Sequence, residues 1–562
     1  MPENTDSTMD KAMYRLALFC ILTLSMVSTA QAGAAAVAMP DRYGAAVARD
    51  ILEGGGNAVD AAIAATFALA VTYPEAGNIG GGGFMLSRMS GENAFLDFRE
   101  RAPGAADRDM YLDEGGNFVQ SQSLIGGKAS GIPGTVRGMQ AAHERYGSLP
   151  WKQLLQPAIV LARDGFTVHE DLAAAAQEML ELEAGRTNFA RYFGQLAAGS
   201  TLRQAELAQT LILIAEDPDS FYTGAIARQI VAQMNNSNGL ISAQDLASYR
   251  AIWRQPLVGQ WREFTVVSAP PPSSGGFALI QLLTMRDYAN EHFKDIWQNS
   301  PAYIHLLAEI EKRVYADRAQ YLGDPDFIDV PIEALLDSAY LKTRAADIQP
   351  NAISKGESVT AGLEPTETTH FSIVDAKGNA VSLTYTLNWD FGSGVVVEGA
   401  GFLLNNEMDD FSAKPGVPNK FGVIGNDNNA IAPNKRMLSS MTPTLLLQDD
   451  NPGLVIGTPG GSTIFTSVFQ VILNLYDYQM PLQAAVDATR YHHQLPAQLL
   501  IRHDQRDIPV ETRQGLEAMG YLVEPNSWGN LGDIQAIQHT SDGLQAASDS
   551  RGRGVAQVFT VP

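Results

Sequence analysis

The chain has 562 residues, of which 45% are hydrophobic and 18% charged, together with 51 Gly and 28 Pro. This supply of apolar side chains excludes a disordered, collagen-like or coiled-coil protein and indicates a globular one with a large core. Acidic residues outnumber basic ones by 62 to 39, which gives a formal net charge of -23. Long-range repulsion therefore disfavours nucleic acids and anionic membrane surfaces as partners.

The N-terminus has the pattern of an export signal. Lys11 and Arg15 precede the apolar run Leu16 to Val27, and a small-residue cleavage site follows at 29–32. We expect residues 1–32 to be a signal peptide and the mature protein to be periplasmic or secreted. An uncleaved anchor is the alternative, although the run is shorter than the ~20 apolar residues that a membrane-spanning helix needs. The sole cysteine, Cys20, lies in this segment, so a cleaved product would contain no disulfide or cysteine nucleophile.

The chain between the export signal and residue 345 has mainly helical patterns. Apolar residues at helical spacing predict helices over 43–52, 58–71, 172–183, 202–215 and 302–321. The glycine run 80–83 lacks the G-K-S/T sequence and the βαβ context of a phosphate loop. We expect these glycines to allow close backbone approach and positive φ angles. Residues 270–276 are expected to form an ordered loop and not a domain linker.

From residue 368 onward the pattern changes to short strands. Runs of β-type residues between Asn, Asp and Gly turns predict strands over 369–374, 380–387, 401–404, 444–448 and 454–457. A helix is predicted to follow over 463–476. The sequence thus predicts an α+β protein whose strands are concentrated late in the chain.

Two familiar kinds of site find little support in the residues. His492, His493 and His503 have no metal-ligand spacing, and surface or core roles are favoured for them. A G-x-S-x-G nucleophile elbow is absent from the sequence. We therefore expect neither a metal site nor serine-triad chemistry.

The informative segment is Pro-Thr-Glu-Thr-Thr-His-Phe-Ser-Ile-Val-Asp at 365–375, which by itself predicts a loop entering a strand. In order and spacing, this segment and several others resemble the motifs of the gamma-glutamyltranspeptidases: residues 54–60, 80–85, 97–100, 270–276, 384–388, 401–411, 438–444 and 459–462. The resemblance covers essentially the whole chain after the export signal. Such a match at many motifs is far more specific than any single motif.

The resemblance implies an N-terminal-nucleophile hydrolase with a four-layer αββα sandwich, formed jointly by two self-cleavage products. The precursor would cut itself between Glu367 and Thr368, giving a large subunit, 33–367, and a small subunit, 368–562, which stay together as a heterodimer. A threonine hydroxyl needs a base at neutral pH, and an α-amino group of pKa about 7.7–8.0 is suited to that task. Cleavage would therefore create the base. The resemblance implies no cofactor.

The resemblance also assigns the reacting groups. Thr368 would attack the γ-glutamyl carbonyl, and Thr386 would form a hydrogen bond with this nucleophile. The backbone amides of Gly460 and Gly461 would form the oxyanion hole, a role that suits glycine because the backbone must approach the substrate closely. The resulting acyl-enzyme would pass to water or to an amino-acid or peptide amine.

The two charges of a γ-linked glutamate would be bound by two sets of residues. The first set would hold the α-carboxylate and consists of Arg99, Ser439 and Ser440. The guanidinium of Arg99 can donate two hydrogen bonds to one carboxylate. The second set would hold the α-ammonium and consists of Asn388, Glu407 and Asp410. Glu407 stands where many bacterial relatives carry glutamine. A lid loop over 414–431 would carry Phe421 as its aromatic gate.

These anchors imply γ-glutamyl compounds such as glutathione as substrates. One alternative is a glutaryl or cephalosporin acylase of the same family, which the ammonium-binding set opposes because a glutaryl group has no ammonium. A second alternative is an inactive exported amino-acid or peptide-binding protein. Retention of Thr368, Thr386 and the two glycines opposes that alternative.

Overall fold

The computed structural model describes residues 33–561 except 355–366, 415–425, 496–498 and 528. The predicted signal peptide and the predicted gate residue Phe421 lie outside the described residues. Within the described ranges, no helix is long and apolar enough to cross a membrane.

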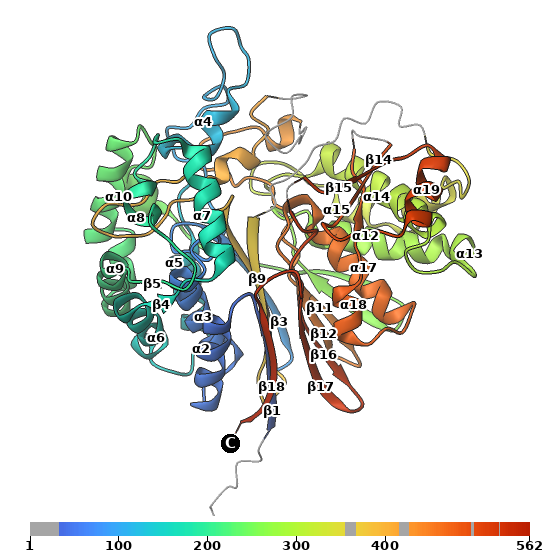
Figure 1. The fold of residues 1–562 in the computed structure, drawn as a ribbon, viewed down its shortest axis with the longest axis horizontal. Helices are drawn as coiled ribbons and strands as arrows, with labels where there is room; N and C mark the ends of the chain where they lie inside the picture. Colours follow the sequence, from blue (N-terminus) through green and yellow to red (C-terminus); the bar gives the residue numbers. More distant parts are fainter. Residues whose placement is uncertain (1–32, 355–366, 415–425, 496–498, 528, 562) are drawn as a thin grey trace, which may run out of the picture.

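Two sheets packed face to face form the centre of the molecule, and helices cover the outer face of each (Figure 1). The 7-stranded sheet has the order β18-β1-β9-β10-β2-β3-β6. Its strands are β1 (Gly33–Met39), β2 (Gly82–Met89), β3 (Glu92–Asp97), β6 (Ile252–Arg254), β9 (Glu367–Val374), β10 (Ala380–Asn388) and β18 (Val555–Val561). The 6-stranded sheet has the order β17-β16-β12-β11-β8-β7. Its strands are β7 (Leu257–Trp261), β8 (Phe264–Ser268), β11 (Thr444–Gln448), β12 (Asn451–Gly457), β16 (Gln535–Thr540) and β17 (Gly543–Ser548).

Three apolar layers hold the four-layer sandwich together. The first lies between the 7-stranded sheet and its helices, which include α2 (Arg42–Glu53), α3 (Ala58–Thr72), α7 (Glu170–Glu183) and α9 (Ala205–Glu216). The second lies between the 6-stranded sheet and α12 (Gly275–Tyr288), α14 (Pro301–Tyr321) and α17 (Ile464–Tyr476). The third fills the space between the sheets with residues such as Phe84, Val267 and Leu445. The predicted α+β class and αββα layering are confirmed.

Strands from both sides of the Glu367–Thr368 bond lie next to one another within each sheet. In the 7-stranded sheet, β1 pairs with β9 on one side and with β18 on the other. In the 6-stranded sheet, β8 pairs with β11. Two chains cut at this bond would therefore share both sheets, and separating them would break backbone hydrogen bonds throughout the core.

The predicted elements are largely confirmed, with three corrections. The segment 401–404 is not a strand, because Gly401 takes a φ of 73° and only Leu403 forms a bridge, to Val396. The helix predicted from residue 202 begins at Ala205, and Leu202 belongs to the two-residue strand β5 (Thr201–Leu202).

The third correction concerns the early strands. Strands are not concentrated late, since β1, β2 and β3 all precede residue 100. Every residue of β2 is buried, so its sequence lacks the alternation that marks a half-exposed strand.

The glycine run before β2 packs against neighbouring backbone. A Cβ added to Gly80 would lie 2.0 Å from the Leu403 carbonyl oxygen, and one added to Gly81 would lie 2.0 Å from that of Thr386. The predicted close approach is confirmed. The predicted positive φ angles are wrong, because none of Gly80 to Gly83 has one.

Candidate active site

The candidate nucleophile lies where β9 begins, beside the end of β10. Tyr385 pairs with Thr369 and Asn388 with Glu367, so Thr386 and Leu387 both face the single residue Thr368. This two-against-one arrangement is a β-bulge, which bends the strand and redirects its side chains. Asn388 ends β10 with a φ of 83°, and its N–H donates to Thr386 Oγ1 at 2.7 Å. The bulge thus turns both threonines toward one cavity.

That cavity gathers the predicted catalytic and substrate-binding residues of the described chain, with Gly460 as the exception. Its lining consists of Arg99, Thr368, Thr386, Asn388, Glu407, Asp410, Ser439, Ser440 and Gly461, together with Met441 and Ile464. The last two residues were not predicted from the sequence. The space among these side chains measures about 10 Å³, about that of one water. A substrate would therefore have to displace contacts that the side chains make with one another.

Gly460 and Gly461 lie where the chain enters α17. Gly461 begins the 3-10 helix η5 (Gly461–Thr463), which runs directly into α17. Both glycines have positive φ angles, of 130° and 54°, which other residues rarely adopt. Among the described residues, neither amide has an acceptor. Unused N–H groups at the positive end of a helix are suited to stabilise a developing oxyanion.

Arg99 lies at the centre of a buried group of charges, with 1% of its side chain exposed. Its guanidinium pairs with Glu407 and, at 2.5 Å, with Asp410 Oδ2. Glu100 Oε2 lies 3.8 Å from Arg99 Nη1. We call these four residues the Arg99 cluster. Arg99 thus contacts two of the three residues predicted to bind an ammonium, and it lines the same cavity as Ser439 and Ser440.

The Arg99 cluster sets three carboxyl groups against one guanidinium. Burial raises the pKa of Glu407 and of Asp410, and Arg99 opposes the rise in both. Burial also raises the pKa of Glu100, to about 8. Four of the six carboxylate oxygens have no hydrogen-bond partner among the described residues: both of Glu100, Glu407 Oε2 and Asp410 Oδ1. The cluster can therefore accept hydrogen bonds from a cation.

Two asparagines fix the 3-10 helix η3 (Glu407–Asp410), which carries two of these carboxylates. Asn405 Nδ2 donates to the carbonyls of Gly80 and Gly131, and its Oδ1 accepts from the Glu407 N–H at 3.1 Å. The carbonyl of Asn406 accepts from Asn388 Nδ2 at 3.1 Å. The sequence motif contained both asparagines, but only the structure assigns them this positioning role.

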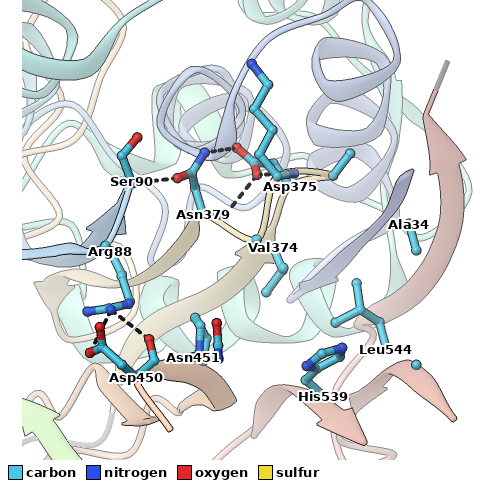
Figure 2. A pocket seen from close by; sticks show the side chains of 16 residues that line it. Ala34, Arg88, Ser90, Val374, Asp375, Asn379, Asp450, Asn451, His539 and Leu544 are labelled. Carbon is cyan, nitrogen blue, oxygen red and sulfur yellow. Dashed lines mark hydrogen bonds and ion pairs between the residues drawn. The ribbon is translucent and has the colours of Figure 1, made fainter. Parts of the chain in front are cut away.

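A much larger cavity lies at the opposite end of β9 and β10, with a volume of about 550 Å³ (Figure 2). Two pairs of its polar side chains are already bonded to each other: Arg88 with Asp450, and Asp375 with Asn379. Neither threonine of the bulge lines this cavity. Size alone therefore does not identify the reactive site.

The three histidines excluded as a metal site have hydrogen-bonding roles in the core. His492 lies between Thr466 Oγ1 and Gln494 Oε1, at 2.9 and 2.7 Å. His493 Nδ1 is 2.9 Å from the Leu500 carbonyl, and His503 Nδ1 is 2.7 Å from that of Asp504. Burial lowers the pKa of His492 to about 3. Of the two predicted roles, surface or core, the structure shows the core role for all three.

Comparisons with known proteins agree with this geometry. The family model described as gamma-glutamyltranspeptidase matches residues 44–559. The chain is 58% identical to the glutathione hydrolase proenzyme of Pseudomonas aeruginosa over 525 residues, which cover 93% of this chain and 94% of that protein. It is 46% identical to the protein of the same name from Escherichia coli over 528 residues, or 92% and 90% of the two chains. A solved cephalosporin acylase from Bacillus halodurans is similar with a TM-score of 0.83 at 28% identity, covering 94% of this chain and 96% of that one.

Proposed function

The chain belongs to the gamma-glutamyltranspeptidase family, and from this premise we propose that it is a self-cleaving gamma-glutamyltransferase and glutathione hydrolase. One observation carries the proposal. The candidate nucleophile Thr368, the glycine Gly461 and three charged residues of the Arg99 cluster all line a single cavity; the three are Arg99, Glu407 and Asp410.

We propose that the Glu367–Thr368 bond is cut first, which frees the α-amino group of Thr368. This amine would take the proton of the Thr368 hydroxyl as its oxygen attacks the γ-carbonyl of the donor. The N–H groups of Gly460 and Gly461 would stabilise the oxyanion. When the C–N bond breaks, the proton passes to the leaving amine and a γ-glutamyl ester remains on Thr368. Water or an acceptor amine then releases the acyl group and restores the hydroxyl.

The Arg99 cluster supplies a reason for selectivity toward γ-linked glutamate. Such a donor keeps both its α-carboxylate and its α-ammonium. The carboxylate would take over Arg99, with Ser439 and Ser440 beside it, while the ammonium would replace the guanidinium at Glu407 and Asp410. Each buried charge thereby exchanges one partner for another, so no charge is left unpaired.

The acylase alternative shares the fold but lacks a use for this cluster. A glutaryl side chain carries no ammonium, and Glu407 and Asp410 would then have no cation to bind besides Arg99. The solved acylase is 28% identical to this chain and a protein named acylase ACY 1 proenzyme is 36% identical, against 58% for the glutathione hydrolase proenzyme. We further propose export, on the basis of the pattern in residues 1–32.

A denaturing gel with N-terminal sequencing tests the proposal. The purified protein should give two chains, the smaller beginning at Thr368, and should hydrolyse a γ-glutamyl anilide. The Thr368→Ala variant should remain one chain and be inactive. If that variant still splits at the same bond, Thr368 is not the nucleophile of self-cleavage.

A further inference from the structure

The long helix α14 is more deeply buried than its sequence indicates. Every residue from Tyr303 to Arg318 is buried, including Glu309, Glu311 and Asp317. Charged residues on a helix normally face solvent, so their burial calls for a purpose in the interior. Two residues spaced three apart, Tyr315 and Arg318, lie on the same face of the helix.

Tyr315 contacts the loop that carries the glycine amides. Its hydroxyl donates a hydrogen bond of 2.5 Å to the Ser462 carbonyl, one residue beyond Gly461. Its ring packs against Phe465 of α17 with centroids 5.0 Å apart. Tyr315 thus fixes the peptide unit between Ser462 and Thr463.

That peptide unit in turn fixes the amide of Gly461. Thr463 donates two hydrogen bonds to the Gly460 carbonyl, from its N–H at 3.0 Å and from its Oγ1 at 2.8 Å. In a planar trans peptide the carbonyl and the following N–H point in opposite directions. Anchoring the Gly460 carbonyl to Thr463 therefore points the Gly461 N–H the other way. The hydroxyl of Tyr315 is the outermost link in this series.

Arg318 acts in the same manner on the other wall of the cavity. Its Nε donates to Ser274 Oγ at 2.9 Å, and Ser274 Oγ donates to the Ser439 carbonyl at 2.8 Å. The same oxygen lies 3.4 Å from Ser440 Oγ. Arg318 thus orients the serine hydroxyl on which the Ser439–Ser440 loop rests.

We propose that α14 is a positioning element of the active site, in which Tyr315 orients the Gly461 amide and Arg318 orients the Ser439–Ser440 loop. This inference rests on the proposed function, because it assigns those two groups to the oxyanion and to the α-carboxylate. Neither Tyr315 nor Arg318 lines the cavity, so both act through other residues. One helix would then hold the reacting end and the binding end of the substrate site in register.

The test separates the two arms by their kinetic signatures. Tyr315→Phe removes one hydroxyl and should lower kcat for a γ-glutamyl anilide about tenfold with little change in KM. Loss of an oxyanion donor outright costs about 100- to 1000-fold, and an indirect effect is smaller. Tyr303→Phe is the matched control, because the Tyr303 hydroxyl on the same helix is buried without a hydrogen-bond partner among the described residues. This control should leave kcat and KM unchanged.

Ser274→Ala and Arg318→Lys should instead raise KM about threefold to tenfold with a smaller change in kcat. Both substitutions act through the Ser274 hydroxyl. The KM of the double variant should therefore not exceed that of the single variant with the higher KM. Each rate is divided by the fraction of enzyme that a denaturing gel shows as two chains. The melting temperature of each variant is measured in parallel.

The possible outcomes distinguish this inference from the proposed function. A wild type without γ-glutamyl hydrolysis would overturn the proposed function itself. An active wild type whose Tyr315→Phe variant matches Tyr303→Phe in kcat would overturn the positioning role of Tyr315. Additive effects of Ser274→Ala and Arg318→Lys would overturn that of Arg318.

Discussion

Two buried ion clusters of this protein both combine arginines with carboxyl groups, and they differ in the ratio of the two. The Arg99 cluster sets one arginine against three carboxylates. A second group, the Arg490 cluster, sets Arg490 and Arg551 against Asp504 and Asp549 in pairs of 2.5 to 2.9 Å. The four residues named in the second cluster therefore have a formal charge of zero, whereas the first cluster has more acidic than basic groups.

The hydrogen bonds show the same contrast. Arg490 donates to the carbonyls of Val486, Leu531 and Gly532 as well as to Asp549. Among the described residues, the Arg490 cluster contributes no buried side-chain atom without a partner. Burial alone would raise the pKa of Asp549, but Arg490 and Arg551 outweigh it and hold that pKa below its usual value. The pKa of Asp410 is shifted the opposite way, upward, by burial. A balanced cluster is suited to stabilise the fold, whereas an unbalanced one is suited to receive a cation.

The largest expected effect comes from unbalancing the Arg490 cluster. Arg490→Met leaves buried aspartate without one of its partners, so we expect the free energy of unfolding to fall by about 3–5 kcal/mol. Arg163→Met is the control, because Arg163 pairs with Asp164 on the surface and its loss should leave the free energy of unfolding nearly unchanged. Chemical denaturation measures both. If kcat/KM of the folded, two-chain Arg490 variant also falls sharply, the division between a stabilising and a receiving cluster is wrong.

Neutralising one carboxylate of the Arg99 cluster should harm activity more than stability. Asp410→Asn removes a partner of the substrate ammonium and should cost about 2–5 kcal/mol in kcat/KM with a γ-glutamyl anilide. A glutaryl anilide, which lacks the ammonium, should be a poor substrate of the wild type and should lose little in the variant. Steady-state kinetics of two enzymes with two substrates tests this. Equal losses on both donors would mean that Asp410 acts through folding, and a wild type that prefers glutaryl would support the acylase alternative.

The extent to which sequence predicted this molecule follows from the kind of signal each part carries. Helices with an apolar face, such as α2, were predicted because their apolar residues recur at helical spacing. The late strands were predicted because Asn, Asp and Gly turns separate them. The strand β2 was missed because it is buried on both faces. The segment 401–404 was predicted wrongly because apolar residues were taken for a strand where positive φ at Gly401 breaks the extended backbone.

The candidate site divides in a similar way. Arg99, Thr368 and Asp410 were identified from motif resemblance, and the structure brings them to one cavity. The direct pairing of Arg99 with Glu407 and Asp410 was not predicted, since it depends on packing between residues about 300 positions apart. Tyr315 and Arg318 were missed because their segment predicts only a helix, and its many charges conceal its burial.

A smaller effect is expected when Arg99 keeps its charge and loses its geometry. Arg99→Lys cannot donate two hydrogen bonds in the fork that a carboxylate accepts, so kcat/KM for a γ-glutamyl anilide should fall by about 1.5–3 kcal/mol. Self-cleavage should survive, because the α-carboxylate anchor takes no part in that step. Kinetics and a denaturing gel measure the two properties on one sample. An unchanged kcat/KM would remove Arg99 from the substrate site.

The smallest expected effect is a pH dependence of stability that originates in the Arg99 cluster. The pKa of Glu100 is raised by burial from 4.5 to about 8, so between these values the folded protein holds a proton that the unfolded chain has lost. Stability therefore falls as pH rises from about 4.5 to about 8, by at most about 1.4 kcal/mol for each pH unit. Glu100→Gln keeps the size of the side chain and cannot ionise, so its melting temperature should fall less than that of the wild type between pH 6 and pH 7. We expect this difference to be about one or two degrees, since three carboxylates share the titration.

Asp504→Asn, in the balanced cluster, serves as the control and should leave the pH dependence of the wild type in place. If the wild type and Glu100→Gln melt in parallel over this range, Glu100 does not hold the proton, and the excess negative charge of the cluster is carried by all three carboxylates.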